Sequence, residues 1–477
     1  MSSGTWSNAN TLYVGYSGTG ALTVSGGYVS GSSGYIGYNG GSNGTATVTS
    51  GTWNTSGILY VGKLGTGALT VNGGYVSDYS SYIGDSGGSN GSVTVTSGTW
   101  RTVSSLHVGL SGMGTLTVNG GYVSDSSGYI GFAGNGTATV TSGTWNNGNA
   151  LYVGQSNTGT LNISGGLVHA GFYTYTGYYG GNGTINLTGS SGNRGVLETG
   201  RVIKDTGSGV INFDGGILRA LDNQSDFISN YQPGDVTLKG GGAFIDTNGF
   251  LFGIGAALSG TGALTKQGAG TLTLSADNSY SGGTTVESGT LVTVNVGTGK
   301  SALGTGAVTV GAAGTLAGVG TVLGDTMVAG TLSPGNSPGK MQFGGALSLD
   351  STAVVRMELA SLASFDQIAV DGLLTYDGEL NITLLGEYAP QVGDTFALFS
   401  AASVANSSQF KAITFNIAGF EGSFDYGTGM LKIVAVPEPS MAGLLALGAG
   451  LLIFQFKRAV RPKAVRCTAR GGFKGFN

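Results

Sequence analysis

The sequence predicts an all-β protein, a right-handed parallel β-helix (solenoid) of about 23 residues per coil, with a C-terminal β cap and one C-terminal hydrophobic helix. The main observation is a phrase based on Gly-x-φ-Thr-Val-x-(Gly/Ser)-Gly, where φ is aliphatic. Its copies follow one another at steps of 22 to 24 residues. They begin at Gly20, Gly44, Gly67, Gly91, Gly114, Gly136, Gly159 and Gly183.

The second observation is that each unit holds two short β-type runs bounded by glycine. In the third unit these runs are 59–62 and 68–72, and 73–76 follow them. Apolar and polar residues alternate along both runs, which is the strand period, and no stretch has helical spacing. Each unit therefore predicts one coil with two or three short strands.

The third observation is that apolar positions form columns when the units are stacked. Columns that stay apolar in every unit must face inward, because a single coil cannot bury its own apolar face. One column reads Val24, Val48, Val71, Val95, Val118, Val140, Ile163 and Leu187. Another reads Val14, Ile36, Val61, Ile83, Val108, Ile130, Val153 and Tyr179.

A further column alternates valine and tryptophan, so the true period is a pair of coils. We expect large residues in one coil to meet small residues in the next, which fills a narrow core. This column reads Val29, Trp53, Val76, Trp100, Val123, Trp145 and Val168.

Composition excludes several classes of function. Only 9% of the residues are charged, against about 25% in ordinary domains. Residues 457–477 hold seven Lys or Arg and no acid, which leaves residues 1–456 with 13 basic and 24 acidic side chains. Such an acidic body repels nucleic acid. The single cysteine, Cys467, cannot form a disulfide within the chain or a cysteine-based metal site.

The pattern changes along the chain and predicts five segments. Residues 1–190 form the regular β-helix array, and 191–345 continue it with irregular spacing. In 346–434 the strands lengthen and glycine thins, which predicts a β capping domain over the open end of the solenoid. Residues 435–461 form a C-terminal signal that contains the hydrophobic helix 441–456, and 462–477 form a basic tail.

Residues 268–286, GAGTLTLSADNSYSGGTTV, resemble the autotransporter-associated β-strand repeat, and 330–339, GTLSPGNSPG, resemble the turn that often follows it. The resemblance is close over roughly 255–400 and looser over the earlier array. It implies the right-handed β-helix of exported passenger domains. The chain has no room for the membrane β-barrel of a true autotransporter, so we do not expect self-translocation.

The C-terminal segment resembles the PEP-CTERM sorting signal, in which a Pro-Glu-Pro motif precedes an apolar helix and a basic cluster. The matching residues are Val436, Pro437, Glu438, Pro439, Lys457 and Arg458. Sixteen apolar residues span about 24 Å as a helix, at the short end for a bilayer crossing. The resemblance implies export, an exosortase-type processing enzyme as partner, and cleavage near Pro437–Pro439. The 21 residues after Phe456 are long for such a signal.

The start of the chain aligns with the interior of a repeat. Residues 1–6, MSSGTW, match 48–53, VTSGTW. An exported protein of this kind should carry a cleaved signal peptide, and none precedes the first repeat. We expect further coils upstream; the alternative is a true start with another export route.

The candidate chemical residues do not form a catalytic or metal set. Asp78 and Asp125 occupy one loop position two coils apart, which indicates a solvated pair rather than a cation or sugar contact. Asp366, Asp371, Asp377 and Glu379 cluster in sequence but fall at strand ends and turns. His107 replaces a tyrosine of one column, and His169 has no partner histidine or cysteine. We predict no catalytic residue, no metal and no cofactor.

One column of tyrosines should face outward, because each tyrosine precedes an inward Val or Ile. A stacked aromatic ladder could bind sugar rings or protein surfaces. The alternative, which the pattern favours, is that the rings only stabilise neighbouring strands. The ladder comprises Tyr13, Tyr35, Tyr60, Tyr82, Tyr129, Tyr152 and Tyr178.

These observations predict a non-enzymatic, exported surface or extracellular-matrix protein of a Gram-negative-type bacterium. It is expected to be anchored transiently in the membrane by its C-terminal helix and then to lie at the cell surface or outside. The alternatives are an adhesin or carbohydrate-binding protein that uses the tyrosine ladder and, third, a polysaccharide-acting enzyme. The expected partners are an exosortase-type enzyme, the membrane before cleavage and extracellular polysaccharide, with no nucleic acid.

Overall fold

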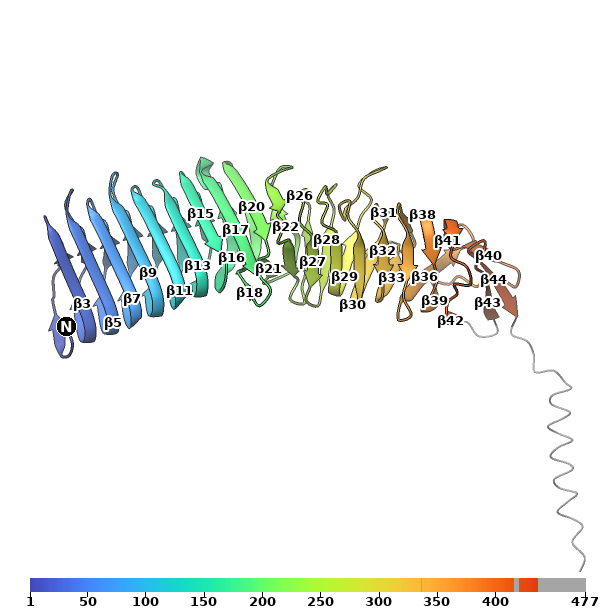
Figure 1. Ribbon diagram of the computed structural model, residues 1–477, viewed down its shortest axis with the longest axis horizontal. Helices are drawn as coiled ribbons and strands as arrows, with labels where there is room; N and C mark the ends of the chain where they lie inside the picture. Colours follow the sequence, from blue (N-terminus) through green and yellow to red (C-terminus); the bar gives the residue numbers. More distant parts are fainter. Residues whose placement is uncertain (336, 416–419, 436–477) are drawn as a thin grey trace, which may run out of the picture.

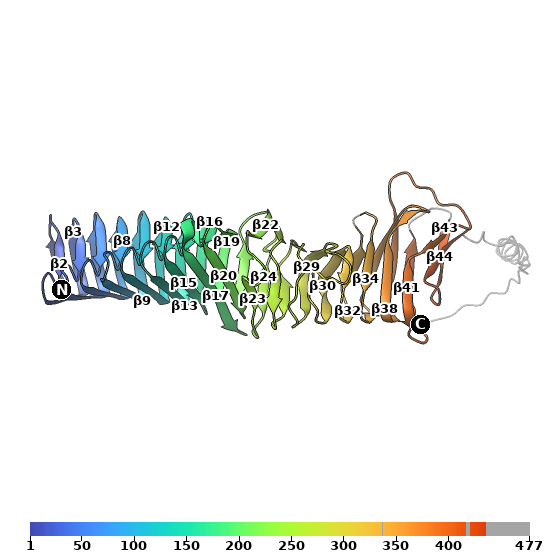
Figure 2. The same ribbon diagram turned by 90° about the horizontal axis from the view of Figure 1, so that it is seen from above.

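A computed structural model describes residues 1–335, 337–415 and 420–435. Within them, 41 strands belong to one hydrogen-bonded sheet that winds along the whole molecule, and a separate sheet holds three. Figure 1 shows the coils in a single, gently curved row, and Figure 2 shows the same order from above. Neighbouring coils pair in parallel, for example Val48 with Val71 and Val71 with Val95. The predicted parallel β-solenoid is confirmed; its right hand stays a prediction.

Each coil of the array consists of one long bent strand and one short strand. The sequence predicted two or three short strands per coil; in the third unit, 59–61 fall on the short strand, and 68–72 and 73–76 belong to one long strand. The long strands are β3 (Thr19–Gly31), β5 (Asn43–Thr55), β7 (Thr66–Asp78), β9 (Asn90–Thr102), β11 (Met113–Asp125) and β13 (Gly136–Asn147). The short strands are β2 (Leu12–Val14), β4 (Gly34–Ile36), β6 (Ile58–Val61), β8 (Ser80–Ile83), β10 (Ser105–Val108), β12 (Ser127–Ile130) and β14 (Leu151–Val153). Strand β1 (Thr5–Ser7) belongs to the first coil.

Glycines allow the coil to bend and to pack tightly. Gly98 has φ +78° at the bend of β9, where the register shifts between neighbouring strands. Gly67 begins the repeated phrase, and a Cβ atom there would lie 2.2 Å from the nitrogen of Gly62 and 2.3 Å from the carbonyl oxygen of Ile36. No side chain fits at such a distance, so the first glycine of the phrase is required by close backbone approach.

The apolar columns lie in the core as predicted. The whole column from Val24 to Leu187 is fully buried, and so are Trp53, Trp100 and Trp145 with the valines between them. Trp6, in the first coil, is 43% exposed because no coil covers it. The other predicted column is correct from Val14 to Val153, but Tyr179 does not continue it. Val153 pairs with Thr176, which is buried, and Tyr179 is exposed in the 3-10 turn η1 (Tyr178–Gly180).

The next part of the parallel stack runs through the last coils of the array and into the irregular segment 191–345. Its strands are β15 (Thr158–Ile163), β16 (Leu167–Thr176), β17 (Asn182–Ser190), β18 (Asn193–Arg194), β19 (Val196–Lys204), β20 (Ser208–Asp214), β21 (Ile217–Ala220), β22 (Gln224–Ser229), β23 (Val236–Leu238), β24 (Ala243–Asp246), β25 (Leu251–Ile254), β26 (Leu258–Gly260), β27 (Leu264–Gln267), β28 (Thr271–Leu274) and β29 (Thr284–Thr293).

The following part of the stack runs through the end of the irregular segment and into the segment predicted as a cap, which begins at residue 346. Its strands are β30 (Val308–Gly318), β31 (Gly320–Val322), β32 (Thr326–Val328), β33 (Thr331–Pro334), β34 (Lys340–Phe343), β35 (Leu347–Leu349), β36 (Val354–Ser361), β37 (Ser364–Phe365), β38 (Gln367–Thr375), β39 (Glu379–Leu384), β41 (Phe399–Val404) and β42 (Ala412–Phe415). Residue 354 pairs in parallel with 379, and 379 with 412. The sheet therefore does not break at residue 346, and the domain boundary there stays a prediction.

A small antiparallel sheet lies at the C-terminal end of the stack (Figure 2). It consists of β40 (Thr395–Ala397), β43 (Phe420–Asp425) and β44 (Met430–Ala435). Its buried Leu431 and Ile433 join the same core as the coils. The part of the chain that the structure describes contains no helix long and apolar enough to cross a membrane. The expected helix 441–456 lies outside the described residues.

Candidate functional surfaces

The tyrosine ladder is a continuous stack of aromatic rings on the face formed by the short strands. Tyr13 and Tyr35 stack at a centroid distance of 5.2 Å, Tyr35 and Tyr60 at 4.5 Å, and Tyr129 and Tyr152 at 4.8 Å. The ladder forms because identical positions of successive coils lie one inter-strand spacing apart. The predicted stack is thus present from Tyr13 to Tyr152.

The last member of the ladder is Tyr175 rather than Tyr178. The register pairs Tyr152 with Tyr175, and their rings stack at 5.1 Å. The step from Tyr152 to Tyr175 is 23 residues, which is the regular period, whereas Tyr178 lies three residues beyond it. The prediction was wrong because polar Thr176 follows Tyr175, where earlier coils have Val or Ile. Tyr178 packs beside the ladder, 4.9 Å from the Tyr152 ring.

His107 occupies a tyrosine position of the ladder, as predicted. It pairs with Tyr82 and Tyr129, and its ring stacks on Tyr129 at 4.5 Å. Burial lowers the pKa of His107 to about 4, so the imidazole is neutral at neutral pH. A neutral ring between two tyrosines extends the aromatic stack and does not act as a base.

Ring stacking limits what the ladder can bind. The faces of inner rings such as Tyr35 and Tyr152 are covered by the neighbouring rings. Exposed are mainly ring edges and hydroxyl groups, with larger exposed areas at Tyr13 (41%) and the adjacent Tyr16 (53%) at one end and at Tyr179 (68%), beside Tyr178, at the other. A sugar ring that binds by stacking needs an open aromatic face. The geometry therefore favours the structural role of the ladder over its entire length except its ends.

Asp78 and Asp125 are not a solvated loop pair; both are buried in the core. The indole N–H of Trp100 donates to Asp78 over 2.8 Å, and that of Trp145 donates to Asp125 over 2.6 Å. Burial raises the pKa of the Asp78 carboxyl to about 6 and that of Asp125 to about 8. The prediction was wrong because each partner lies in the next coil, 20 or 22 residues along the chain.

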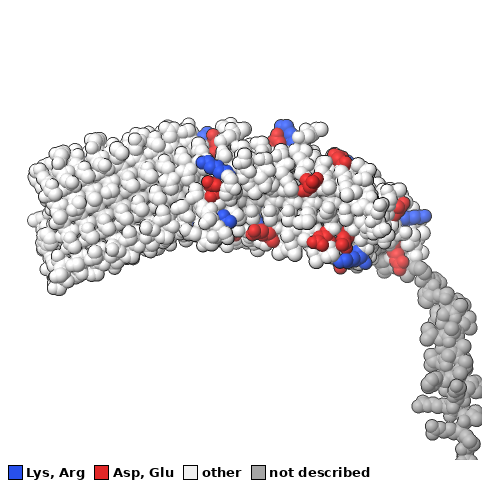
Figure 3. Space-filling view, viewed as in Figure 1, with Lys and Arg blue, Asp and Glu red and all other residues white. Residues whose placement is uncertain are grey.

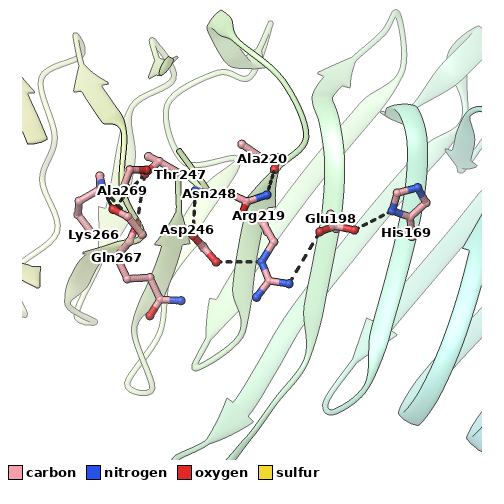
Figure 4. Close-up of polar contacts among 11 residues, drawn as sticks. His169, Glu198, Arg219, Ala220, Asp246, Thr247, Asn248, Lys266, Gln267 and Ala269 are labelled. Carbon is pink, nitrogen blue, oxygen red and sulfur yellow. Dashed lines mark hydrogen bonds and ion pairs between the residues drawn. The ribbon is translucent and has the colours of Figure 1, made fainter. Parts of the chain in front are cut away.

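A ladder of ion pairs crosses four coils where the regular array ends (Figure 4). It joins His169 of β16, Glu198 of β19, Arg219 of β21 and Asp246 of β24, which are register neighbours. The distances are 2.7 Å from His169 to Glu198, 3.8 Å from Arg219 to Glu198 and 2.8 Å from Arg219 to Asp246. The predicted lack of a His or Cys partner for His169 overlooked this carboxylate.

Lys266, in the neighbouring coil, is a buried cation held by backbone carbonyls (Figure 4). Its Nζ donates to the carbonyl oxygens of Gln267, Gly268 and Ser288 over 3.1, 2.7 and 2.9 Å. Burial lowers its pKa to about 8. The amine and the ion-pair ladder both have their charge compensated inside the protein, so neither offers an open catalytic group.

The acids that cluster in the sequence of the C-terminal segment do not come together in the structure. Asp366 is buried and accepts the backbone N–H groups of Gly339 and Glu358 over 2.7 and 2.9 Å. Asp371 accepts a hydrogen bond from Gln342, and Asp377 lies 3.8 Å from Lys411. These three acids thus have separate partners, and Glu379 is exposed at the start of β39. Across 1–335, 337–415 and 420–435, no group of three or more His, Cys, Asp or Glu could hold a metal ion.

The predicted sorting residues lie outside the described residues. They are Val436, Pro437, Glu438, Pro439, Lys457 and Arg458.

Two comparisons with known proteins find similarity over parts of the chain. The passenger-associated-transport-repeat family matches residues 264–292, which span β27, β28 and most of β29 and include Lys266. The chain is also 41% identical over 83 residues to the adhesin BmaC autotransporter of Brucella suis biovar 1 (strain 1330). This match covers 17% of the chain and 2% of that adhesin. The predicted autotransporter-associated repeat is confirmed, and the solenoid is passenger-like; the sorting signal stays a prediction.

Proposed function

We propose that this protein is an exported, non-enzymatic β-solenoid that is displayed at the cell surface and acts in adhesion. The observation that carries the proposal is a passenger-associated transport repeat built into one uninterrupted parallel stack. A long solenoid presents an extended flank on which many weak contacts add up. The paired acids described above offer no arrangement of acid and base for hydrolysis.

Display and adhesion can be tested in native cells with the gene deleted and then restored. We expect the full chain to be accessible to added protease on intact cells. Attachment of the deletion strain to glycan-coated or protein-coated surfaces should fall, and restoration should recover it. Protection of the chain in intact cells, or unchanged attachment on every surface, would contradict the proposal.

The sorting proposal rests on the sequence of the C-terminal segment. In it, an exosortase-type enzyme cleaves near Pro437–Pro439, and the helix 441–456 is a transient membrane anchor. The mature chain would lose the seven positive charges of 457–477 and become distinctly acidic. Intact-mass measurement of material released from native cells tests this step. A released chain that still carries Cys467 would reject processing.

A second candidate is carbohydrate binding at the N-terminal end of the tyrosine ladder. It is favoured there by the exposure of Tyr13 and Tyr16, and extracellular polysaccharide is the expected partner. Tyr13→Ala with Tyr16→Ala removes both rings, while Tyr79→Ala, on an equally exposed ring away from the ladder, serves as the control. Loss of glycan-array binding in the double variant alone would support this candidate; equal binding by all forms would reject it.

A further inference from the structure

The first segments of the long strands form a flat face of small side chains, which we name the Thr face. Its central column, which in β9 lies four residues before the bend at Gly98, is threonine in six successive coils. The column on one side contains Ala, Thr or Ser, and the column on the other contains Ser, Thr or Asn. The central column reads Thr23, Thr47, Thr70, Thr94, Thr117 and Thr139; its neighbours read Ala21, Thr45, Ala68, Ser92, Thr115 and Thr137, and Ser25, Thr49, Asn72, Thr96, Asn119 and Thr141.

The central and first columns repeat regularly in two directions. From Gly20 to Val24 and in the five coils that follow, each residue pairs with its counterpart without a register shift. Figure 1 shows β3 to β13 side by side and nearly parallel. Neighbouring coils are about 4.8 Å apart, and alternate residues of a strand are about 6.7 Å apart. These two columns therefore cover roughly 24 by 7 Å with a two-dimensional array of side chains, and the third column lies beyond the register shift.

The threonine hydroxyls of this array are free to bind something outside the protein. Within the described residues, no side-chain hydrogen bond involves Oγ1 of Thr23, Thr47, Thr70, Thr94 or Thr117. In the three coils after Thr139 the central column consists of asparagines, and each side chain donates a hydrogen bond to the column member of the preceding coil. The distances are 3.4 Å for Asn162, 2.7 Å for Asn186 and 2.9 Å for Asn212.

The Thr face is also uncharged. The charged residues of 1–193 are Lys63, Asp78, Asp85, Arg101 and Asp125, and none belongs to the three columns. In Figure 3 the N-terminal part of the visible face shows no Lys, Arg, Asp or Glu, whereas charges begin farther along. No long flexible side chain covers the array. Because the array itself carries no charge, we expect its partner to be neutral.

We propose that the Thr face binds crystalline water, that is, the surface of ice. The spacings between coils and along strands are close to the two repeat distances of oxygen atoms on a prism face of hexagonal ice. Threonine is β-branched and holds few rotamers, so the hydroxyls keep fixed positions, and each methyl group fills the space beside them. Water ordered by such an array can merge with the lattice, because the central column supplies a hydroxyl in every coil and the first column supplies one in four of the six coils, all but Ala21 and Ala68.

A soluble ligand fits this face less well. It has no hollow, no charge and no open aromatic ring, which are the features that hold small molecules and sugars. A single hydroxyl-to-sugar hydrogen bond replaces one to water and adds little net free energy. A flat, repeating and neutral surface gains binding free energy only from a partner that is itself flat, repeating and neutral.

The test uses the purified full chain in assays of ice recrystallisation and of adsorption to a growing ice crystal. Thr94→Tyr places a large ring in the middle of the array. Thr99→Tyr is the matched control, because it lies in the same strand and its neighbours Tyr75 and Tyr122 show that the position accepts tyrosine. Circular dichroism and thermal unfolding of both variants establish that they fold.

We expect the wild type and Thr99→Tyr to inhibit recrystallisation and to be incorporated into ice. Thr94→Tyr should need a roughly tenfold or higher concentration, because multivalent contacts are lost together. No activity in the wild type, or equal activity in Thr94→Tyr, would overturn the proposal. Binding of a soluble polysaccharide that Thr94→Tyr abolishes, without any effect on ice, would overturn it in favour of a glycan surface. Attachment of cells to coated surfaces is a separate measurement, so adhesion can fail while ice binding holds, and the reverse.

Discussion

The regular array and the segment after it stack their coils by opposite means. In the array, identical side chains of successive coils stack on one another, as the tyrosines do along the short strands. In the following segment, unlike charges alternate from coil to coil, as with Glu198, Arg219 and Asp246. Figure 3 shows the same division as a white N-terminal part and a part with charges.

This difference explains why the array contains so few charges. A perfect repeat puts the same residue in the same place of every coil, about 4.8 Å from its copy. Two like charges at that distance repel each other, whereas uncharged groups lose nothing by stacking. Charged residues therefore fit where opposite signs meet in neighbouring coils, as with Lys63 and Asp85 inside the array and with Glu198, Arg219 and Asp246 after it.

The largest effect should come from the core of the array. Trp100→Ala should cost about 3–5 kcal/mol, because it opens a cavity and leaves the buried Asp78 without its indole donor. Hydrogen exchange localised to the coils around β9, together with denaturant unfolding, measures it. Trp6→Ala is the control, because Trp6 is 43% exposed. Equal effects of the two substitutions would mean that burial does not decide the stability of the array.

The next effect is a pH dependence of the array. The folded state raises the pKa values of Asp78 and Asp125 to about 6 and about 8, so it favours the protonated carboxyls. This stabilisation is full below the unfolded pKa of about 4 and is lost as the pH rises through 6 and 8. The free energy of unfolding should thus fall by a few kcal/mol between pH 4 and pH 9.

Asp125→Asn should flatten this profile, because the amide oxygen still accepts the indole N–H and carries no charge. Asp85→Asn, which removes the carboxylate that pairs with Lys63, should keep the wild-type slope. Thermal unfolding followed at several pH values compares the three proteins. A profile that rises with pH, or one that Asp125→Asn leaves unchanged, would argue against a protonated carboxyl in this core.

A smaller effect tests the rule that like charges cannot stack. Thr70 and Thr94 are register neighbours on the Thr face. Replacing both with Glu should destabilise the array by about 1 kcal/mol relative to Thr70→Glu with Thr94→Lys. A double-mutant cycle at low salt measures the difference, which should shrink at high salt. No difference at low salt would mean that another constraint keeps charge out of the array.

The smallest effect concerns Trp53, whose indole N–H lacks the carboxyl acceptor that Trp100 and Trp145 have. Trp53 is buried, and its indole N–H has no partner, because Gly31 stands where Asp78 and Asp125 stand for the other tryptophans. Gly31→Asp should raise the free energy of unfolding by up to about 1 kcal/mol at pH 5, where the carboxyl is protonated. Gly31→Ala adds the Cβ atom alone and should give less. If the two variants are equally stable, the new carboxyl does not reach the indole.

The sequence alone determined the period, the inward columns and the passenger-like repeat. Val48, Val71 and Trp100 could be placed correctly, because each coil must bury the same positions against the next. The outward direction of the tyrosine column followed from strand alternation. These properties depend on patterns that repeat within the sequence.

Only the tertiary structure decided which side chains meet between coils. Asp78 and Asp125 look like loop residues until Trp100 and Trp145 of the next coil are placed over them. The ion-pair ladder joins residues 29, 21 and 27 positions apart, so no fixed offset could have paired them. Tyr175 and Tyr178 each precede one residue and a glycine, and only the strand register shows that Tyr175 belongs to the ladder. A repeat predicts its own continuation, whereas contacts made where it breaks depend on loop lengths that only the folded chain determines.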